Sequence, residues 1–249
     1  MKIRLDNALV ELNLVKSRTL AQKVISEGCV KVNDNLISKS SEKVDIELDK
    51  ITVSENPECM KYVGRGGFKL EKAISEFGLN LDEKICLDIG ASTGGFTDCM
   101  LQNGAKRVFA VDVGSNQLDI SLKSNPKVIS LEQLDIRNVS DEINEQVDFI
   151  SIDVSFISLK HILPEIIRFS SEHAEAVALI KPQFENGKSK NGKNGVIKDP
   201  KIHKKIVDDI VTFSEALGFA SIKVIPSPIS GGDGNREFLM YLRINKTEE

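Results

Sequence analysis

Several features that would assign these 249 residues to other classes of protein are scarce or absent. The sequence has no tryptophan, and no apolar run approaches the roughly 20 residues that a membrane-spanning helix needs. Its N-terminal stretch, MKIRLDNALVELNLVKSRTL, is interrupted by charges every few positions, unlike a secretory signal. We therefore expect a soluble globular protein with no membrane partner.

Cysteine and histidine are also sparse. The four cysteines form no Cys-x-x-Cys pair and have no metal-like spacing with the three histidines. Neither a disulfide scaffold nor a metal site is expected, and a reducing cytoplasm is the default location. The cysteines are Cys29, Cys59, Cys86 and Cys99.

The net charge of −4 argues against a uniformly basic nucleic-acid binder, but it leaves room for local patches. Residues 1–39 carry seven Lys and Arg against four Asp and Glu. Residues 40–60 reverse this balance, with two basic and six acidic side chains. This swing predicts a small module with one basic face, followed by an acidic connector whose best linker candidate is 54–61.

Helical periodicity predicts a helix pair in the first module. Ser17 suits the N-cap of the second helix, Gly28 suits its C-terminal stop, and VKVND predicts a strand entering a turn at Asn33-Asp34. The two apolar stripes are Leu5, Leu9 and Leu12, and Leu20, Val24 and Ile25.

From residue 84 onward, short apolar runs alternate with helical stretches. Asp199 and Pro200 suit the N-cap and first position of the clearest helix, whose apolar stripe runs from Ile202 to Leu217. Regular βα alternation predicts a doubly wound, Rossmann-like α/β domain with a mostly parallel sheet. The seven expected strands are 84–89, 107–112, 127–131, 147–153, 175–181, 220–225 and 236–244.

A glycine-rich loop, DIGASTGGFTD (88–98), follows the first of these strands. A dinucleotide fingerprint would need glycine where Ser92 stands, and no Lys-Ser/Thr follows as in a P-loop. The pattern resembles instead the first motif of S-adenosylmethionine-dependent methyltransferases, although a glycine-rich turn alone is often only a tight connection. The candidate cofactor residues here are Asp88, Gly90, Ser92, Gly94, Gly95 and Phe96.

Two further carboxylates lie at the ends of the next two strands. Asp112 stands where a carboxylate can accept both ribose hydroxyl hydrogens, and Asp135 stands where such folds bind adenine. Together with the glycine loop they favour a methyltransferase that uses S-adenosylmethionine.

Four charged residues form a candidate catalytic group: Lys69, Asp153, Lys181 and Glu237. Each alone could be an ordinary solvated charge. Lys181 follows an apolar run, where desolvation lowers a lysine pKa and nearby carboxylates raise it again. A ribose 2′-hydroxyl is a very weak acid, so its methylation needs a base or a cation that stabilises the alkoxide.

These four residues match, in order and context, the Lys-Asp-Lys-Glu tetrad of FtsJ-like ribose 2′-O-methyltransferases. The N-terminal module resembles an S4 RNA-binding domain, and the two together resemble the TlyA, or hemolysin A, family. The S4-like positions are Arg4, Leu5, Asp6, Ser17, Arg18, Ala21, Ile25, Gly28 and VKVN (30–33).

The resemblance implies methylation of cytidine ribose in ribosomal RNA, with S-adenosylmethionine as cofactor and rRNA or ribosomal subunits as partner. Lys181 would take the proton or stabilise the alkoxide, Asp153 would position Lys181, and Lys69 and Glu237 would orient the ribose. It also implies an S4-like domain over 1–60, a linker and domain start over 61–83, and the methyltransferase domain over 84–249.

Basic side chains supply candidate RNA contacts, with a solvated surface as the alternative. Residues 181–205 hold eight lysines against two acids, in a stretch that we interpret as a flap over RNA. Phe68, Phe96 or Phe156 could stack on a flipped base, although core positions suit at least two of them. The candidate contacts are Arg4, Lys16, Arg18, Lys23, Lys31, Arg65, Lys188, Lys190 and Lys193.

Other readings remain open at this point. The chain could be an RNA-binding or ribosome-assembly module whose methyltransferase fold is not catalytic, or, as the family's second name suggests, a hemolysin. A base methyltransferase would more typically have an N-P-P-Y-like strand end or a nucleophilic cysteine. Gly64, Gly66 and Gly67 predict a hinge beside Lys69, and the oligomeric state is open, with a monomer favoured.

Overall fold

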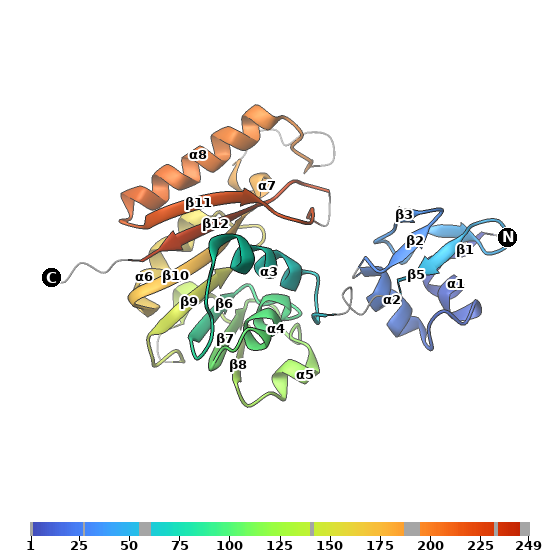
Figure 1. The fold of residues 1–249 in the computed structure, drawn as a ribbon, viewed down its shortest axis with the longest axis horizontal. Coiled ribbons are helices and arrows are strands. Elements are labelled where there is room, and N and C mark those ends of the chain that lie inside the picture. The colour runs from blue at the N-terminus through green and yellow to red at the C-terminus, as the bar shows by residue number, and fades with distance from the viewer. Residues whose placement is uncertain are drawn as a thin grey trace. The chain divides into compact units, whose positions relative to one another are not determined.

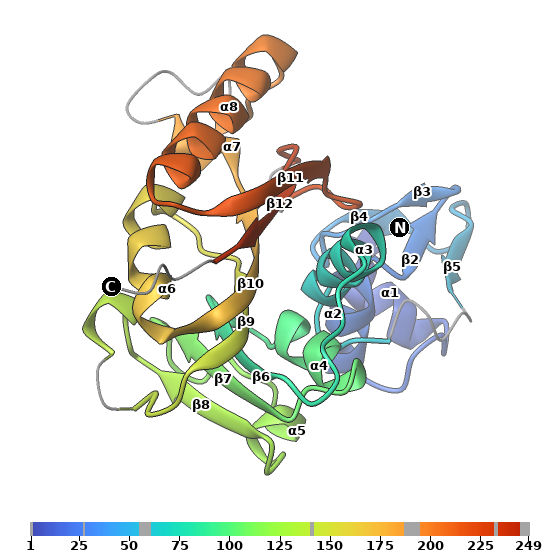
Figure 2. The ribbon, with the colours of Figure 1, turned by 60° about the vertical axis from the view of Figure 1, so that its left-hand side comes forward.

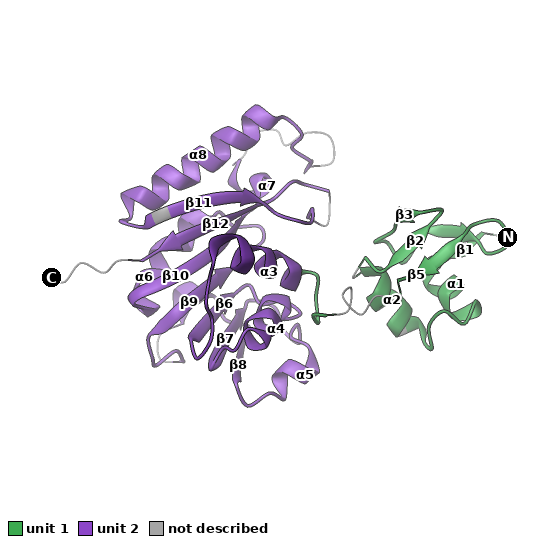
Figure 3. Cartoon of the chain, in the orientation of Figure 1, with its two compact units in different colours: residues 1–65 green, residues 66–249 purple. Residues whose placement is uncertain are grey.

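The computed structural model describes residues 2–26, 28–54, 61–139, 142–186, 195–231 and 234–244. The chain divides into two compact units, residues 1–65 and 66–249 (Figure 1, Figure 3).

Unit 1 packs two helices with two small antiparallel sheets. Strand β1 (Lys2–Arg4) pairs with β4 (Lys43–Asp45), and β2 (Val30–Val32) lies between β3 (Asn35–Leu36) and β5 (Ile51–Val53). The helices are α1 (Leu5–Glu11) and α2 (Arg18–Ser26).

Local signals in unit 1 act as the sequence predicts. The Ser17 hydroxyl accepts the Leu20 N–H, and Gly28 follows α2 with a φ of 73°. Asn33 and Asp34 both have positive φ, as a two-residue hairpin turn requires. The stripe of the first helix is shorter than expected: Leu12 is 39% exposed, because α1 ends at Glu11.

Unit 2 is built on a seven-stranded sheet in the order β11-β12-β10-β9-β6-β7-β8. All neighbours are parallel except β12, which is antiparallel to both β10 and β11, so the expected mostly parallel α/β sheet is confirmed. The strands are β6 (Ile85–Ile89), β7 (Arg107–Asp112), β8 (Val128–Glu132), β9 (Val147–Ile152), β10 (Ser170–Ile180), β11 (Ala220–Pro226) and β12 (Phe238–Arg243).

Helices cover both faces of this sheet (Figure 2). Helices α3 (Gly66–Phe77) and α4 (Gly95–Gln102) lie on one face, with the short α5 (Ile120–Lys123) near β8. Helices α6 (Leu163–Phe169) and α8 (Pro200–Ala216) lie on the other. The remaining turns are η2 (Ile136–Asn138), η3 (Leu159–His161) and α7 (Pro182–Glu185).

The helix expected after Asp199 is confirmed. Asp199 accepts the Lys201 N–H at 2.8 Å, and Pro200 is its first residue. Its buried face includes His203, Ile206 and Ile210, whereas Ile202 is 38% exposed. The apolar stripe therefore starts one turn later than the sequence suggested.

The hinge expectation is wrong for Gly66 and Gly67, because both are residues of α3. A Cβ at Gly66 would lie 3.3 Å from the Phe96 ring, so this glycine permits close packing of α3 on α4. Among the described helices of the chain, none is long and apolar enough to cross a membrane.

Candidate active site

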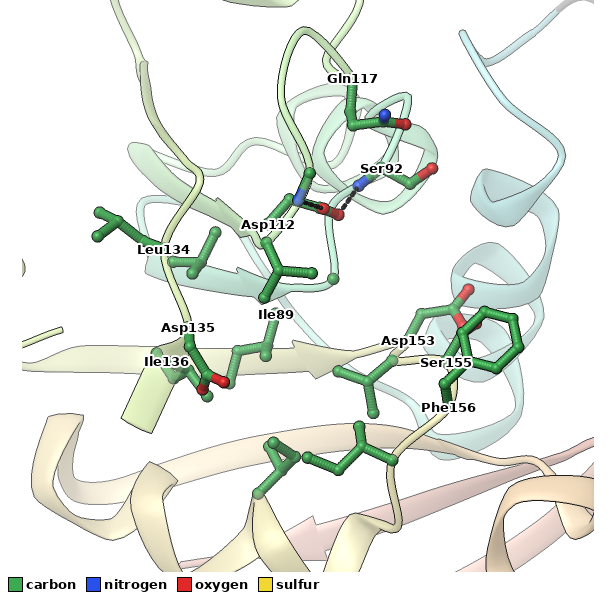
Figure 4. A pocket seen from close by; sticks show the side chains of 17 residues that line it. Ile89, Ser92, Asp112, Gln117, Leu134, Asp135, Ile136, Asp153, Ser155 and Phe156 are labelled. Carbon is green, nitrogen blue, oxygen red and sulfur yellow. Dashed lines mark hydrogen bonds between the residues drawn. The ribbon is translucent and has the colours of Figure 1, made fainter. Parts of the chain in front are cut away.

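The site lies at the carboxyl ends of the parallel strands, where the chain order of the sheet reverses between β6 and β9. The loops after these two strands diverge there, which is where open α/β sheets bind ligands. A cavity of about 430 Å³ opens at this point, within the range of small-molecule sites (Figure 4). It is lined on one side by β6 and β7 and on the other by the segment after β9.

The glycine-rich loop passes between these strands because two of its positions exclude a side chain. Gly90 has a φ of 82°, and a Cβ there would lie 2.5 Å from the backbone oxygen of Asp153. Gly94 has a φ of 96°, and its Cβ would overlap Leu122 and Leu118. The loop is therefore held against the segment that carries Asp153.

The two carboxylates expected at strand ends both line this cavity. Asp112 accepts the Ser92 N–H and the Gly114 N–H, each at 2.7 Å and each on a different oxygen. Asp135 is paired with the Arg137 guanidinium, which lowers the pKa of that carboxyl. Each carboxylate oxygen of Asp112 accepts one backbone hydrogen bond, which leaves a second lone pair on each for a ligand hydroxyl.

Asp88 is not exposed at all and lines neither cavity of the site. Its carboxylate accepts the Thr97 hydroxyl at 2.7 Å and the Ser151 hydroxyl at 2.8 Å. The pKa of Asp88 is raised to about 6, mainly because the carboxyl group is buried. Asp88 therefore joins β6, α4 and β9 beneath the glycine loop.

The four tetrad candidates come together from distant parts of the chain. Lys69 of α3 donates to Glu237 at 2.8 Å and lies 3.7 Å from Asp153, and Lys181 lies 2.6 Å from the other Asp153 oxygen. Positive and negative groups thus alternate from Glu237 to Lys181. All four side chains are at most 19% exposed, so solvent screens them little.

A second cavity, of about 180 Å³, joins this ion network to the glycine loop. It shares four residues with the larger cavity, so the two form one continuous site. Gly95 and Phe96 line only the smaller one. The shared residues are Gly90, Ser92, Asp153 and Ser155.

Ser155 is a site residue that the sequence reasoning missed. Its hydroxyl accepts the Lys181 ammonium at 2.9 Å. Its position two residues after Asp153, at the same strand end, is a signal that could have identified it. Gln117, which lines the larger cavity, gave no such signal.

The three phenylalanines considered for base stacking differ in exposure. Phe96 is buried, Phe68 of α3 is half-buried, and Phe156 is 90% exposed with a φ of 65°. The Phe156 ring packs on Phe184, with centroids 5.0 Å apart. Phe156 is the phenylalanine of these three that stands open at the cavity.

Two of the candidate RNA contacts in unit 1 share a buried acidic partner. Asp6 is fully buried and accepts from Arg4, Arg18 and Gln22. These donors hold the pKa of its carboxyl well below the usual range. The Arg18 side chain is still 56% exposed, so this arrangement orients it without covering it.

The other candidate RNA contacts are spread over the chain. Lys16, Lys23 and Lys31 are exposed on unit 1, and Arg65 is half-buried. Lys188, Lys190 and Lys193 lie outside the described residues.

Other chemistries find little support at this site. No cluster of three or more His, Cys, Asp or Glu suited to a metal ion occurs among the described residues. Cys86 and Cys99 are buried in β6 and α4, and burial raises the pKa of the Cys86 thiol to about 12. A thiolate nucleophile for base methylation is therefore not provided by these two cysteines.

Two family models match the chain, one over most of unit 1 and the other chiefly over unit 2. Residues 62–244 match the FtsJ-like methyltransferase model, and residues 3–49 match the S4 domain model.

The chain is also similar to proteins that contain both parts. It is 38% identical to the 16S/23S rRNA (cytidine-2′-O)-methyltransferase TlyA of Mycobacterium tuberculosis (strain ATCC 25618 / H37Rv), over 97% of this chain and 90% of that protein. It is 41% identical to Hemolysin A of Brachyspira hyodysenteriae, over 97% and 100%. The solved structure of a "Putative hemolysin from Streptococcus thermophilus" has 40% identity and a TM-score of 0.76, over 99% and 90%. The chain belongs to the TlyA (hemolysin A) family, in which an S4 domain precedes an FtsJ-like methyltransferase domain.

Proposed function

We propose that this protein transfers a methyl group from S-adenosylmethionine to the ribose 2′-oxygen of a cytidine in ribosomal RNA, in the cytoplasm. The observation that carries the proposal is the alternating network of Glu237, Lys69, Asp153 and Lys181, which borders a cavity continuous with the glycine loop. The function named for the TlyA relative supports the choice of rRNA and of cytidine.

The residues present fit the proposed cofactor. Asp112 would accept the ribose hydroxyls of the adenosine, and Asp135 would lie at the adenine, beside the apolar side chains Leu134 and Ile136. Gly90, Gly95 and Asp153 all line the smaller cavity, where the methionine part would lie. When bound, S-adenosylmethionine supplies a methyl group activated by its sulfonium.

Lys181 would act on the 2′-hydroxyl. As the bond from the 2′-oxygen to the methyl carbon forms, the bond from that carbon to sulfur breaks, and the hydroxyl proton leaves. Lys181 takes this proton as the free amine, or stabilises the alkoxide as the ammonium. Asp153 and Ser155 fix its Nζ from two directions.

Lys69 and Glu237 would complete the charge network and orient the ribose. Lys69 lies between the carboxylates of Asp153 and Glu237, which hold its Nζ in place to bind the ribose. Removing any one member leaves its neighbours without an ionic partner, so the effects of single substitutions are not additive.

Unit 1 would bind the phosphate backbone of the RNA. Arg18 begins α2, where a helix N-terminus also favours phosphate, and Arg4 shares its Asp6 partner. This contribution is electrostatic and should weaken steeply with added salt.

The test is transfer of labelled methyl from S-adenosylmethionine to ribosomal subunits purified from cells that lack this protein. We expect the label on a cytidine 2′-oxygen, mapped by nucleoside digestion, and a loss of roughly 10²- to 10⁴-fold in Lys181→Ala, as for removal of a general base. Lys84→Ala is the matched control, because Lys84 is also a part-buried lysine in an ion pair, with Glu175 at 2.7 Å, outside both cavities. Salt-dependent binding of rRNA without transfer to either subunit or to naked RNA would instead support an RNA-binding module with a non-catalytic fold.

A further inference from the structure

Two segments that carry catalytic candidates are joined side by side over their whole length. One is the β9 loop (residues 153–159), and the other is the β10 turn (residues 181–185). At the end nearest the ion network, Lys181 bonds Asp153 and Ser155. In the middle, the rings of Phe156 and Phe184 are in contact. The proposed chemistry accounts for the first of these contacts. It does not explain why the rest of the β9 loop is attached to the β10 turn.

Glu185 joins the β10 turn to the β9 loop at the end farthest from the ion network. Its carboxylate accepts the Ser158 hydroxyl at 2.5 Å and the Leu159 N–H at 2.8 Å. Ser158 also caps η3 through the Lys160 N–H at 3.2 Å. Glu185 therefore fixes both the end of the β9 loop and the start of the next turn.

A carboxylate in this place is not favoured by its surroundings. Burial raises the pKa of Glu185 above its usual value, against the two hydrogen bonds and the nearby Lys160 and His161, which lower it. An apolar residue in the short α7 would avoid the cost of desolvating a carboxylate. What the carboxylate adds is a bidentate hold on residues 158 and 159.

The part of the β9 loop between its two attachments is the part that faces the cavity. Phe156 is 90% exposed, has a left-handed backbone, and is described in ring contact with Phe184 alone. An exposed ring on such a backbone keeps one orientation only if the chain on both sides of it is fixed. The ion network fixes one side, and Glu185 fixes the other.

We propose that Glu185 is a positioning residue for the RNA substrate, which holds the β9 loop so that Phe156 and Ser155 stand beside Lys181 where the target nucleotide must lie. This inference rests on the proposed function. The Glu185 carboxylate has no described contact with a proposed cofactor residue or with a side chain of the ion network; only its backbone N–H donates to the Lys181 carbonyl, at 3.3 Å. Its effect should therefore fall on the RNA more than on S-adenosylmethionine.

The test compares the steady-state kinetics of Glu185→Ala and Glu185→Gln on ribosomal subunits. We expect Glu185→Ala to raise KM for the subunit about tenfold, with kcat changed less, because an interaction made equally in the ground and transition states is lost. Glu185→Gln should recover most of this loss, since its amide oxygen can accept the Leu159 N–H and its NH₂ can donate to Ser158. The dissociation constant for S-adenosylmethionine, measured by calorimetry, should stay within about twofold of the wild type in both variants.

A double-mutant cycle separates positioning from general loosening of the fold. If Glu185 acts through Phe156, then Phe156→Ala and Glu185→Ala should each raise KM, and the double variant should be little worse than the worse single one. Additive effects would overturn the proposal. If Glu185→Ala fails to fold, Ser158→Ala removes one of the two contacts and should give a smaller rise in KM.

Glu175→Ala is the matched control in the middle of β10, where Glu175 accepts from Lys84 and Tyr241. It should leave KM for the subunit unchanged. An unchanged KM in Glu185→Ala, or an equal loss of subunit and S-adenosylmethionine binding together with a lower melting temperature, would sink the positioning role. A wild-type protein that transfers no methyl would instead overturn the proposed function.

Discussion

Among the residues that the structure describes, each unit of this protein buries one aspartate completely, and the pKa values of the two carboxyl groups are shifted in opposite directions. Asp6 of unit 1 and Asp88 of unit 2 are both 0% exposed. The pKa of Asp6 is lowered, chiefly by its hydrogen bond to Arg4. The pKa of Asp88 is raised to about 6, chiefly by burial, with only the hydroxyls of Thr97 and Ser151 as side-chain donors.

The difference shows that burial alone does not decide the charge of a carboxyl group in this protein. A cationic partner keeps Asp6 ionised, and its two arginines are partly exposed, which suits a surface that binds phosphate. Asp88 has neutral partners, and the Asp153 charge raises its pKa further.

The largest expected effect is that of Asp6→Ala on unit 1. The substitution removes the acceptor shared by two guanidiniums and one amide, at an expected cost of roughly 3 to 4 kcal/mol in free energy of unfolding. That is a large share of the stability of a small domain. Hydrogen exchange measured by mass spectrometry on the full chain should show lost protection in α1 and α2 and unchanged protection in unit 2.

The control for this prediction is Asp34→Ala. Asp34 also pairs with a cation, Lys50 at 3.4 Å, but its side chain is 79% exposed. Surface pairs of this kind contribute little, so protection in unit 1 should not change. Unaltered protection in Asp6→Ala as well would mean that the saturated carboxylate does not stabilise unit 1.

A smaller effect, of opposite sign, is expected for Asp88→Asn. Because the folded pKa of about 6 lies above the ordinary value of 3.8, folding keeps a proton that the unfolded chain releases between these values. The wild type should therefore lose stability as pH rises from about 4 through 6, by on the order of 2 kcal/mol. The asparagine variant cannot titrate and should lack this dependence. Urea unfolding followed by circular dichroism from pH 4 to 7.5 measures it, and parallel curves for the two proteins would contradict the raised pKa.

These two aspartates also mark what the sequence could and could not predict. The strands, the cap of α8 and the place of Asp153 and Lys181 at strand ends follow from local patterns of apolar and capping residues. The sequence assigned Asp88 to the cofactor site because it opens the loop motif. Whether it lines a cavity or lies beneath it depends on the neighbouring strand, where Ser151 stands opposite Asp88 in the parallel register.

Contacts between distant positions were harder still to foresee. Glu185 meets Ser158 across 27 positions of sequence, with no motif that links them. The sequence predicts Arg4 and Arg18 as RNA contacts, but it gives Asp6 only as part of a family pattern and not as the partner that both arginines share. The exact ends of helices were also hard to predict. Leu12 belongs to the predicted apolar stripe of the first helix, but it follows the last residue of α1 and is exposed.

The smallest expected effect concerns Glu132, a carboxylate near the surface that accepts several hydrogen bonds. It tests whether such a carboxylate contributes to stability or to cofactor binding. Glu132 accepts the Lys123 ammonium at 2.7 Å and the N–H groups of Gln117 and Leu118, and these donors lower its pKa to about 2. Its stabilising effect is present above the ordinary value of 4.5 and is lost as pH falls through about 2, the same sign as for Asp6.

Because Glu132 holds the loop that places Gln117 at the larger cavity, Glu132→Gln should weaken S-adenosylmethionine binding a few-fold and barely change the melting temperature at pH 7. Calorimetric titration and thermal unfolding measure the two effects, with Glu145→Gln as the control. Glu145 also pairs with a cation, Arg107, but lies outside both cavities, so its replacement should leave binding unchanged. A marked loss of stability in Glu132→Gln would place this carboxylate with Asp6. Unchanged binding would mean that the loop stays in place without the Glu132 carboxylate.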